Sequence, residues 1–253
     1  MKLNYKREPK PDALSSKRST TARLGVGMID KRLQLYKVPK RSKLFQKNPY
    51  KTAMKLYDYL PSGNSYKVRL LLSYLSISYE WENLDIIKGE TQTEAFKAKN
   101  PSGQIPLLEL SNGRRIAESN AILFFLAEGT PYWPSNAYDQ AKCLQWMFFE
   151  QYKHEPNVAV ARFIHHYAMD QRENELPVLH KKGYAALDMM EAHLADNLWF
   201  VGSGPTVADI ALYAYTHVAG EGGFDMAAYP NIMAWCDRVS DHPKHIRITD
   251  TPA

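Results

Sequence analysis

The stretch Asn100-Pro101-Ser102-Gly103-Gln104-Ile105-Pro106 decides how the first half of this chain is expected to fold. Its prolines and glycine interrupt regular structure, so it separates a helix predicted over Thr91–Lys99 from a β-hairpin. The hairpin strands are predicted over Ile105–Leu110 and Arg114–Ala117, around Ser111-Asn112-Gly113. An Asn-Gly pair accepts the positive φ angles of a tight hairpin turn. We therefore expect an irregular loop that leads into the hairpin.

Two strands and a helix are predicted upstream of this loop. Lys55–Tyr59 and Tyr79–Leu84 have the aromatic or alternating composition of short strands. Between them, Asn64 and Ser65 can cap a helix whose apolar residues recur at spacings of three and four. After the hairpin, Ser119 can cap a last, apolar helix that Gly129 ends.

The order β-α-β-α-β-β-α over residues 54–129 predicts a four-stranded mixed sheet with helices on its faces, an α/β domain. Residues 130–137 contain two prolines and are predicted to be a linker. The chain then becomes helical over residues 138–249, with an interruption or kink at Pro156. Thr206 and Asp209 form a capping-box pattern before an almost wholly apolar segment. This segment is expected to be the buried central helix of an all-α domain.

The charge of the chain is unevenly distributed. Of the 32 Lys and Arg and 27 Asp and Glu, residues 1–53 hold 15 and three, so this leader is strongly basic and the remainder is acidic. Three interpretations of residues 1–53 are open: binding to nucleic acid or anionic lipid, an organelle-targeting peptide, or a disordered extension without a site. We favour the third, because the predicted fold begins at Met54, and we do not expect nucleic acid as a partner.

Membrane insertion and metal binding are not expected. No apolar run approaches the roughly 18 residues that a membrane span needs. The two cysteines, Cys143 and Cys236, are far apart and have no metal-like spacing. Their scarcity fits a reducing compartment, and we expect a cytoplasmic protein. His165 and His166 are adjacent and would point to different helix faces, so they do not indicate a metal site.

Three strings resemble the cytosolic, bacterial-type glutathione S-transferase family at the family's spacing. They are Asn100–Pro106, Glu118-Ser119-Asn120-Ala121-Ile122 and Thr206-Val207-Ala208-Asp209, and the resemblance covers about Met54 to Ile248. It implies a thioredoxin-like N-terminal domain that binds glutathione, followed by a helical domain. Family members usually dimerise, so the resemblance also implies a homodimer.

The resemblance assigns glutathione-binding roles to five residues. Pro106 lies where the family has a cis proline, and an X–Pro bond takes the cis form at a cost of roughly 0.5–1 kcal/mol. The Ile105 backbone would then pair with the cysteinyl backbone of glutathione as an added strand. The helix start at Glu118 and Ser119 would hold the γ-glutamyl group, because a helix N-terminus attracts a carboxylate. Gln104 would reach the glycyl end.

Thiolate formation needs further donors, since a free thiol has a pKa of about 8.5. The candidates are Ser62, at the position of the family's catalytic serine, Asn64, at the position of a cysteine or an assisting asparagine, and Ser65. A cysteine-type site is excluded because neither Cys143 nor Cys236 lies near this helix start.

A small hydrophobic electrophile would bind between the two domains. The predicted lining residues are Trp146, Phe149, Tyr152, His154, Arg162 and His165. The implied reaction is conjugation of the glutathione thiolate to this electrophile, a detoxification chemistry. Two alternatives are open: reduction of a disulfide or peroxide by two glutathiones on the same site, and a non-catalytic interaction module with this fold.

Overall fold

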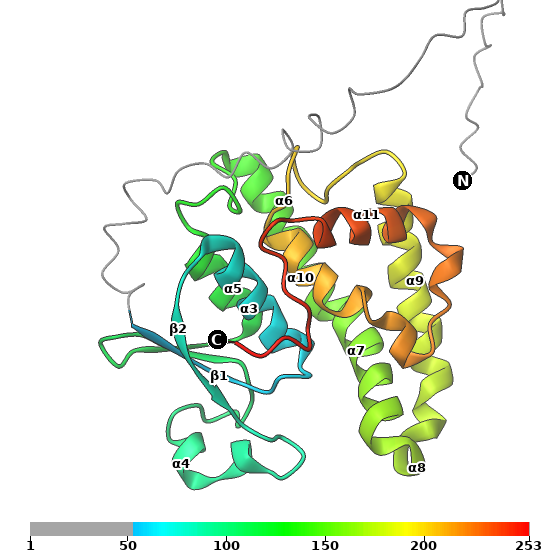
Figure 1. The fold of residues 1–253 in the computed structure, drawn as a ribbon. Coiled ribbons are helices and arrows are strands. Elements are labelled where there is room, and N and C mark those ends of the chain that lie inside the picture. Colours follow the sequence, from blue (N-terminus) through cyan, green and yellow to red (C-terminus); the bar gives the residue numbers. More distant parts are fainter. Residues whose placement is uncertain (1–52, 253) are drawn as a thin grey trace, which may run out of the picture. The chain divides into compact units, whose positions relative to one another are not determined.

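A computed structural model describes residues 53–252. An α/β part comes first and a helical part follows it (Figure 1). The predictions about the basic leader fall outside the described residues, apart from Ala53.

The predicted four-stranded mixed sheet is confirmed. Its strands are β1 (Met54–Asp58), β2 (Tyr79–Asn83), β3 (Leu107–Glu109) and β4 (Arg115–Ala117), in the order β2-β1-β3-β4. β1 runs parallel to β2 and antiparallel to β3, and β3 runs antiparallel to β4. β3 begins two residues later than predicted, since Pro106 has no N–H to donate to a ladder.

Helices cover both faces of this sheet. α3 (Gly63–Leu75) and α5 (Ser119–Ala127) pack on the face that carries Leu56 and Leu108. On the opposite face, Phe96 of α4 (Glu94–Lys97) packs with Tyr57 and Leu107, as the alternation of side chains along a strand requires.

The single helix predicted over Thr91–Lys99 is wrong. A 3₁₀ turn, η2 (Glu90–Gln92), and the short α4 replace it. Thr93 separates them because it is extended, with φ −67° and ψ 149°, and its hydroxyl accepts a hydrogen bond from the Phe96 N–H.

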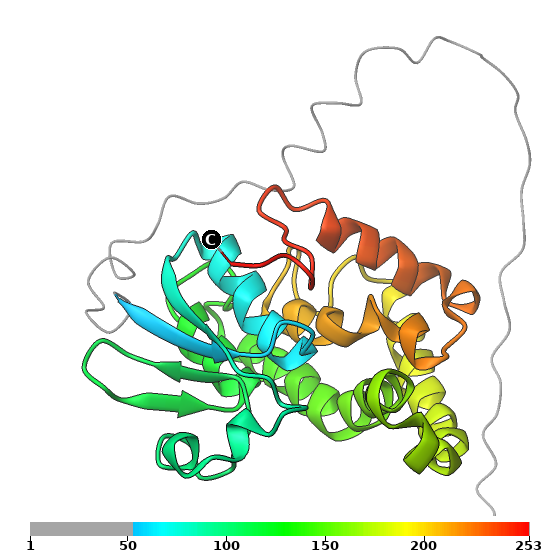
Figure 2. The same cartoon turned by 60° about the horizontal axis from the view of Figure 1, so that its bottom comes forward.

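The second part is helical, as predicted, and Figure 2 shows it beside the sheet. Its elements are α6 (Ala137–Phe149), the π turn η3 (Glu150–His154), α7 (Glu155–Phe163), a second π turn η4 (Ile164–Ala168), α8 (Met169–Arg172), η5 (Glu173–Glu175), α9 (Leu176–Leu194), α10 (Val207–Thr216), η6 (Ala219–Gly222), η7 (Met226–Ala228) and α11 (Pro230–Ser240). The interruption predicted at Pro156 takes the form of the first π turn. Among residues 53–252, no helix is both long and apolar enough to cross a membrane.

α10 is the buried central helix, and its predicted capping box is present. The Asp209 carboxylate accepts from the Thr206 N–H at 2.8 Å, from the Phe200 N–H at 3.1 Å and from the Trp235 indole at 3.0 Å. Asp209 therefore joins the start of α10 to α11 and to the preceding loop.

The C-terminal segment returns from α11 to α3 (Figure 1). The Tyr66 hydroxyl donates to the Ile246 carbonyl at 2.6 Å, and the Ser73 hydroxyl to the Lys244 carbonyl at 2.8 Å. Tyr66 is fully buried, so α3 has no solvent face at this position. α3 is thus enclosed by the sheet, α5, α10 and the returning segment.

Candidate functional site

A cavity of about 520 Å³ lies between the α/β part and the helical part. The α/β wall consists of the start of α3, the loop that ends at Pro106, and the start of α5. The helical wall consists of side chains from η3, α7, α8 and α10. Lining residues from the α/β part include Ser62, Asn64, Asn100, Ser102, Gln104, Ile105, Pro106, Glu118 and Ser119.

The loop before β3 forms part of the cavity wall. The Ile105–Pro106 peptide bond is cis, and both residues line the cavity. Ile105 lies before the paired register of β3, which begins where Leu107 meets Tyr57. The loop itself is held by Asn100, whose side chain donates to the Gln104 carbonyl at 2.8 Å. Gln104 lines the cavity from an exposed position.

The start of α5 also faces the cavity, with a strained residue before it. Glu118 has φ 66° and ψ 115°, a conformation that non-glycine residues rarely adopt. Such outliers persist where the surrounding structure holds them, and they cluster at functional sites. Ser119 is the first residue of the helix, and Glu118 precedes it at the cap position. The unpaired N–H groups of this helix end provide a site for a carboxylate.

The start of α3 differs from its prediction. The helix begins at Gly63, and Ser62 is the N-cap, with its hydroxyl oxygen accepting from the Ser65 N–H at 3.3 Å. Ser62 and Asn64 line the cavity. Ser65 does not: it is fully buried and its hydroxyl has no hydrogen-bond partner. Ser65 is therefore not placed to donate to a thiolate. It follows Asn64 by one position on the helix, about 100° further around the axis, so its side chain points toward the core.

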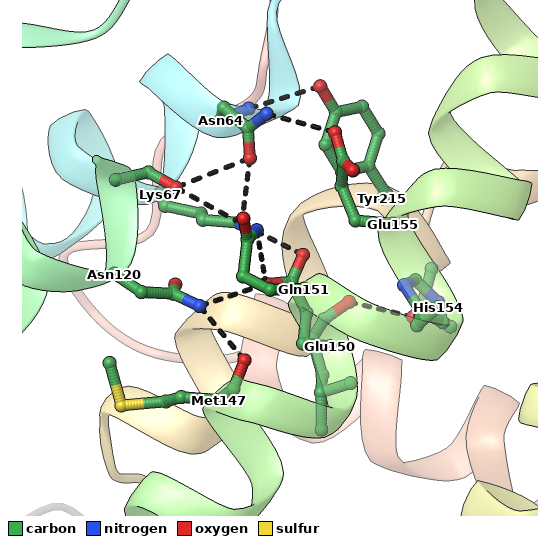
Figure 3. A network of polar contacts seen from close by, with 12 residues as sticks. Asn64, Lys67, Asn120, Met147, Glu150, Gln151, His154, Glu155 and Tyr215 are labelled. Atoms are coloured by element: carbon green, nitrogen blue, oxygen red, sulfur yellow. Dashed lines mark hydrogen bonds and ion pairs between the residues drawn. The ribbon is translucent and has the colours of Figure 1, made fainter.

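A buried ion pair contacts the side-chain oxygen of Asn64 (Figure 3). The Lys67 ammonium lies 2.8 Å from the Glu150 carboxylate, and both side chains are fully buried. The same ammonium donates to the Asn64 side-chain oxygen at 2.8 Å and to the Ser119 hydroxyl at 3.3 Å. One cation thus contacts a residue from each of the two helix starts.

Glu150 gathers further donors from the helical part. Its second oxygen accepts from the Asn120 amide at 3.0 Å and from the Gln151 amide at 2.9 Å. The residue belongs to the π turn between α6 and α7. π turns inside helices are frequent at functional sites, and this one places a carboxylate where it neutralises Lys67.

The other end of Asn64 contacts the helical wall. Its Nδ2 atom donates to Glu155 Oε1 at 3.1 Å, and its backbone N–H donates to the Tyr215 hydroxyl at 3.3 Å (Figure 3). Glu155 and Tyr215 both line the cavity. Burial raises the pKa of both side chains, which keeps the tyrosine neutral and makes the carboxyl easier to protonate.

The residues predicted for the electrophile pocket lie outside the lining of this cavity. Trp146 packs against Phe200 in the core, Phe149 is partly buried against Trp146, and Tyr152 is 83% exposed. Arg162 pairs with Glu221 at 2.6 Å and donates to the Pro61 carbonyl, while His165 packs against the ring of His180. His154 is fully buried, and its Nε2 atom lies 3.0 Å from the Thr216 hydroxyl. None of these residues is among those that line the cavity.

The π turns account for the predicted residues that follow them, but not for Trp146 and Phe149, which precede the first π turn. A π turn adds one residue to a helical turn, so every later side chain rotates by about 100° relative to an uninterrupted α-helix. The helical wall of the cavity consists instead of residues that were not predicted from the sequence: Gln151, Glu155, Ala159, Val160, Phe163, Arg172 and Tyr215. Pro156 was the signal for the interruption, and no residue pattern indicated which way the helix would turn after it.

The cysteines lie away from this site. Cys143 and Cys236 are free and buried, and neither lines the cavity. Burial raises the pKa of Cys143 to about 11, so its thiol is unreactive near neutral pH. Within residues 53–252 there is no group of three or more His, Cys, Asp or Glu side chains arranged to hold a metal ion.

Family models match both parts of the chain. The glutathione S-transferase N-terminal domain matches residues 52–128, and the glutathione S-transferase C-terminal domain matches residues 146–243. Together they cover more than half of the chain.

Solved structures and curated relatives agree with these matches. A glutathione S-transferase from Pseudomonas fluorescens is 53% identical, with a TM-score of 0.77 over 79% of this chain and 100% of that one. Ure2p in complex with glutathione shares the fold at 23% identity, with a TM-score of 0.70 over 80% of this chain and 95% of that one. A maleylacetoacetate isomerase from Dictyostelium discoideum is 30% identical over 74% of this chain and 87% of its own length. The chain belongs to the glutathione S-transferase family.

Proposed function

We propose that this chain binds glutathione in the cavity and conjugates its thiolate to a small electrophile. One observation carries the proposal: three separate chain segments bring suitable groups to the same cavity. These segments are the start of α3, the loop that ends at Ile105–Pro106, and the start of α5 at Glu118–Ser119. A glutathione-bound relative of the same fold, Ure2p, supports glutathione as the ligand.

The binding roles follow from the chemistry of each segment. The Ile105 backbone would pair with the cysteinyl backbone, and Pro106 holds the bend in place. The N–H groups at the start of α5 and the Ser119 hydroxyl would bind the γ-glutamyl carboxylate, and Glu118 its ammonium group. Gln104 would contact the glycyl end from the loop.

Asn64 and Ser62 would donate hydrogen bonds to the thiolate. The Asn64 oxygen is already bonded to the Lys67 ammonium, which withdraws charge from the amide and strengthens its N–H groups as donors. One of those N–H groups is directed at Glu155, which leaves the second for a ligand. The Ser62 oxygen accepts from the Ser65 N–H, and its hydroxyl also lies within hydrogen-bonding reach of Tyr215, so a bound sulfur would take the place of Tyr215 as the acceptor.

The electrophile would bind against Phe163, Val160, Ala159 and Tyr215. These side chains form the apolar part of the helical wall, and Arg172 lies at its edge. This wall replaces the lining that the sequence analysis predicted.

The test measures retention on immobilised glutathione and turnover of chlorodinitrobenzene. Asn64→Ala should lower kcat/KM about 10²-fold or more, the loss seen when one donor to a developing anion is removed. Ser65→Ala is the matched control, because its hydroxyl is buried beside the site without a partner, and it should behave as the wild type. Glu118→Ala and Ser119→Ala should weaken retention.

Other outcomes would support the alternatives. Turnover of bis(2-hydroxyethyl) disulfide without turnover of chlorodinitrobenzene would support a glutathione-dependent reductase. Failure to bind glutathione at all would support a non-catalytic interaction module. Equal activity of Asn64→Ala and the wild type would overturn the assignment of Asn64.

We also propose a cytoplasmic homodimer with a detoxification role. Phe148 and Tyr152 lie four residues apart and are 68% and 83% exposed, an apolar pair that a second copy could cover. Light scattering after gel filtration measures the oligomeric state, and a monomer at micromolar concentration would contradict this proposal. The two free cysteines fit a reducing compartment.

A further inference from the structure

Glu155 introduces a carboxyl group into a cavity that the proposed chemistry requires to hold an anion. It is the first residue of α7, directly after the π turn, and it lines the cavity. The functions assigned above do not use it. A carboxylate beside a thiolate is unfavourable unless one of the two carries a proton, because like charges in a desolvated site repel.

The position of Glu155 is tightly defined by its neighbours. Its Oε1 atom accepts from Asn64 Nδ2 at 3.1 Å, and Asn64 is the proposed donor to sulfur. The Tyr215 hydroxyl, bonded to the Asn64 backbone N–H at 3.3 Å, lies beside it (Figure 3). Glu155 and the sulfur would therefore share one amide group between them.

The surrounding charges favour the protonated carboxyl. Burial is the largest cause that raises the pKa of Glu155, and the carboxylates of Glu150 and Glu118 raise it further. Lys67 and the hydrogen bond from Asn64 lower it, but the Lys67 ammonium already pairs with Glu150 at 2.8 Å. Tyr215 is neutral and contributes no charge. A bound thiolate would add one more negative charge and shift the balance further toward the protonated form.

We propose that Glu155 is a catalytic proton donor, and that this chain accordingly acts on epoxides, whose ring oxygen must gain a proton when glutathione attacks. The proposal rests on the proposed function. It names a substrate class through a residue that is unnecessary for binding glutathione.

The reaction balances without a further reactant. Glu155 begins the cycle protonated, and the thiol proton of glutathione passes to solvent as the thiolate forms. The sulfur electron pair then forms a bond to an epoxide carbon, the bond from that carbon to oxygen breaks, and its electron pair moves to the oxygen. Glu155 donates its proton to this oxygen, giving a hydroxy thioether, and the resulting carboxylate regains a proton from solvent before the next cycle.

Aryl halides provide the contrast. When chlorodinitrobenzene reacts, chloride leaves as a stable anion and no proton is needed on the leaving atom. Loss of a general acid should therefore affect the epoxide reaction and leave the halide reaction almost unchanged. A residue that only positions Asn64 would affect both reactions to the same extent, because both use the same thiolate.

The variant for this test is Glu155→Gln. Glutamine keeps the length of the side chain and a carbonyl oxygen that accepts from Asn64 Nδ2, but it cannot hold a transferable proton at this position. Glu173→Gln removes a carboxylate from an exposed position in the same helical part and is the matched control. Both variants and the wild type are assayed with styrene oxide and with chlorodinitrobenzene, and glutathione binding is measured by calorimetry.

Glu155→Gln should lower kcat/KM for styrene oxide about 10²-fold, the lower end of the range for general acid catalysis. Its kcat/KM for chlorodinitrobenzene and its affinity for glutathione should stay close to the wild-type values. In the wild type, the epoxide rate should fall on the alkaline side of its pH profile as Glu155 loses its proton, and this limb should be absent from the variant. Glu173→Gln should match the wild type in every assay.

Three results would overturn the inference and remain distinguishable from failure of the proposed function. Equal losses with both substrates would make Glu155 a positioning residue. No loss with styrene oxide would leave it without a catalytic role. A wild type that converts chlorodinitrobenzene but not styrene oxide would exclude the substrate class alone. A wild type that binds no glutathione, or converts neither substrate, would overturn the proposed function and the inference with it.

Discussion

α3 carries two fully buried cations, Lys67 and Arg69, two residues apart, and they perform different tasks. Lys67 pairs with Glu150 at 2.8 Å, and Arg69 with Asp58 at 2.9 Å, with all four side chains at 0% exposure. A buried ion pair does not by itself add stability, because removing two charges from water offsets their attraction. The remaining partners of each cation therefore decide what each pair does.

The partners of Arg69 are main-chain groups far apart in the sequence. Its guanidinium donates to the Leu60 carbonyl at 2.6 Å, the Ile248 carbonyl at 3.1 Å and the Asp250 carbonyl at 3.2 Å. The forked geometry of arginine suits several acceptors at once. Arg69 thus joins α3, the end of β1 and the returning C-terminal segment.

The partners of Lys67 are side chains at the cavity. Its ammonium contacts Asn64 and Ser119, which line the cavity from two different helices. A lysine ammonium is a compact charge with three donors, and here all three are used. The comparison shows that burial and pairing alone do not distinguish a structural ion pair from one that organises a site. The two kinds of pair are distinguished by the other groups that the cation contacts: main-chain carbonyls for Arg69 and cavity side chains for Lys67.

Arg69→Met should cause the largest loss of stability of any change considered for this comparison. It leaves the Asp58 carboxylate buried without its cation and three carbonyl groups without their donor. Breaking one side of a buried pair costs about 3–5 kcal/mol, and the lost carbonyl contacts add to this. Urea unfolding measures the loss.

The control is Arg115→Met, which breaks the partly exposed pair with Glu109 and should cost about 1 kcal/mol or less. If Arg69→Met lost no more stability than this control, Arg69 would not hold the segments together as described. Folded Arg69→Met protein should keep the wild-type affinity for glutathione.

Lys67→Met should lower stability by about 3 kcal/mol and also impair the site. Glu150 loses its cation, while Asn64 and Ser119 lose the donor that orients them. We therefore expect a loss of kcat/KM toward chlorodinitrobenzene that persists under conditions where the variant is fully folded by circular dichroism.

The double substitution Lys67→Met with Glu150→Met separates the two effects. It removes both buried charges, so stability should recover toward the wild-type value. Activity should not recover, because the Asn64 oxygen still lacks its partner. Recovery of both would mean that Lys67 serves only the fold, as Arg69 does, and the distinction between the two pairs would fail.

Much of the fold could be predicted from local patterns. The four-stranded mixed sheet followed from the succession of strands and helices, and the capping box at Thr206 and Asp209 appears in the structure with both partners. The elements that bring the two proposed glutathione-binding segments to the cavity were also predicted, because their signals are short and continuous in the sequence.

The helical wall could not be predicted, because it depends on where a helix changes its pitch. Trp146 and Phe149 are apolar residues of α6 and pack in or against the core, while the π turn that follows rotates Tyr152 outward and Glu155 into the cavity. The pairs on α3 were missed for a different reason. Lysine and arginine beside an apolar stripe suggest a solvent-exposed face, but α3 is enclosed on all sides.

The smallest effect concerns pH and His154, which lies next to the Lys67–Glu150 pair. The ring is fully buried, and its Nε2 atom lies 3.0 Å from the Thr216 hydroxyl, which donates its own proton to the Leu212 carbonyl. Nε2 therefore carries the ring proton, and Nδ1 is buried without a partner. Protonation would place an unpaired charged N–H in the core, and burial accordingly lowers the pKa of His154 to about 4.

This histidine should make the folded protein sensitive to acid. Its pKa is near 6.5 when the chain is unfolded, so between about pH 6.5 and pH 4 the unfolded state binds more protons and stability falls with the pH. The loss should reach roughly 2 kcal/mol at pH 5. His154→Gln keeps an N–H for Thr216 and removes the titration. The difference in unfolding free energy between the two proteins, measured by urea at equal concentrations, should therefore change by that amount from pH 7 to pH 5. A difference that does not change with pH would show that the acid sensitivity arises elsewhere, in His217 or His242, whose pKa values burial also lowers to about 4.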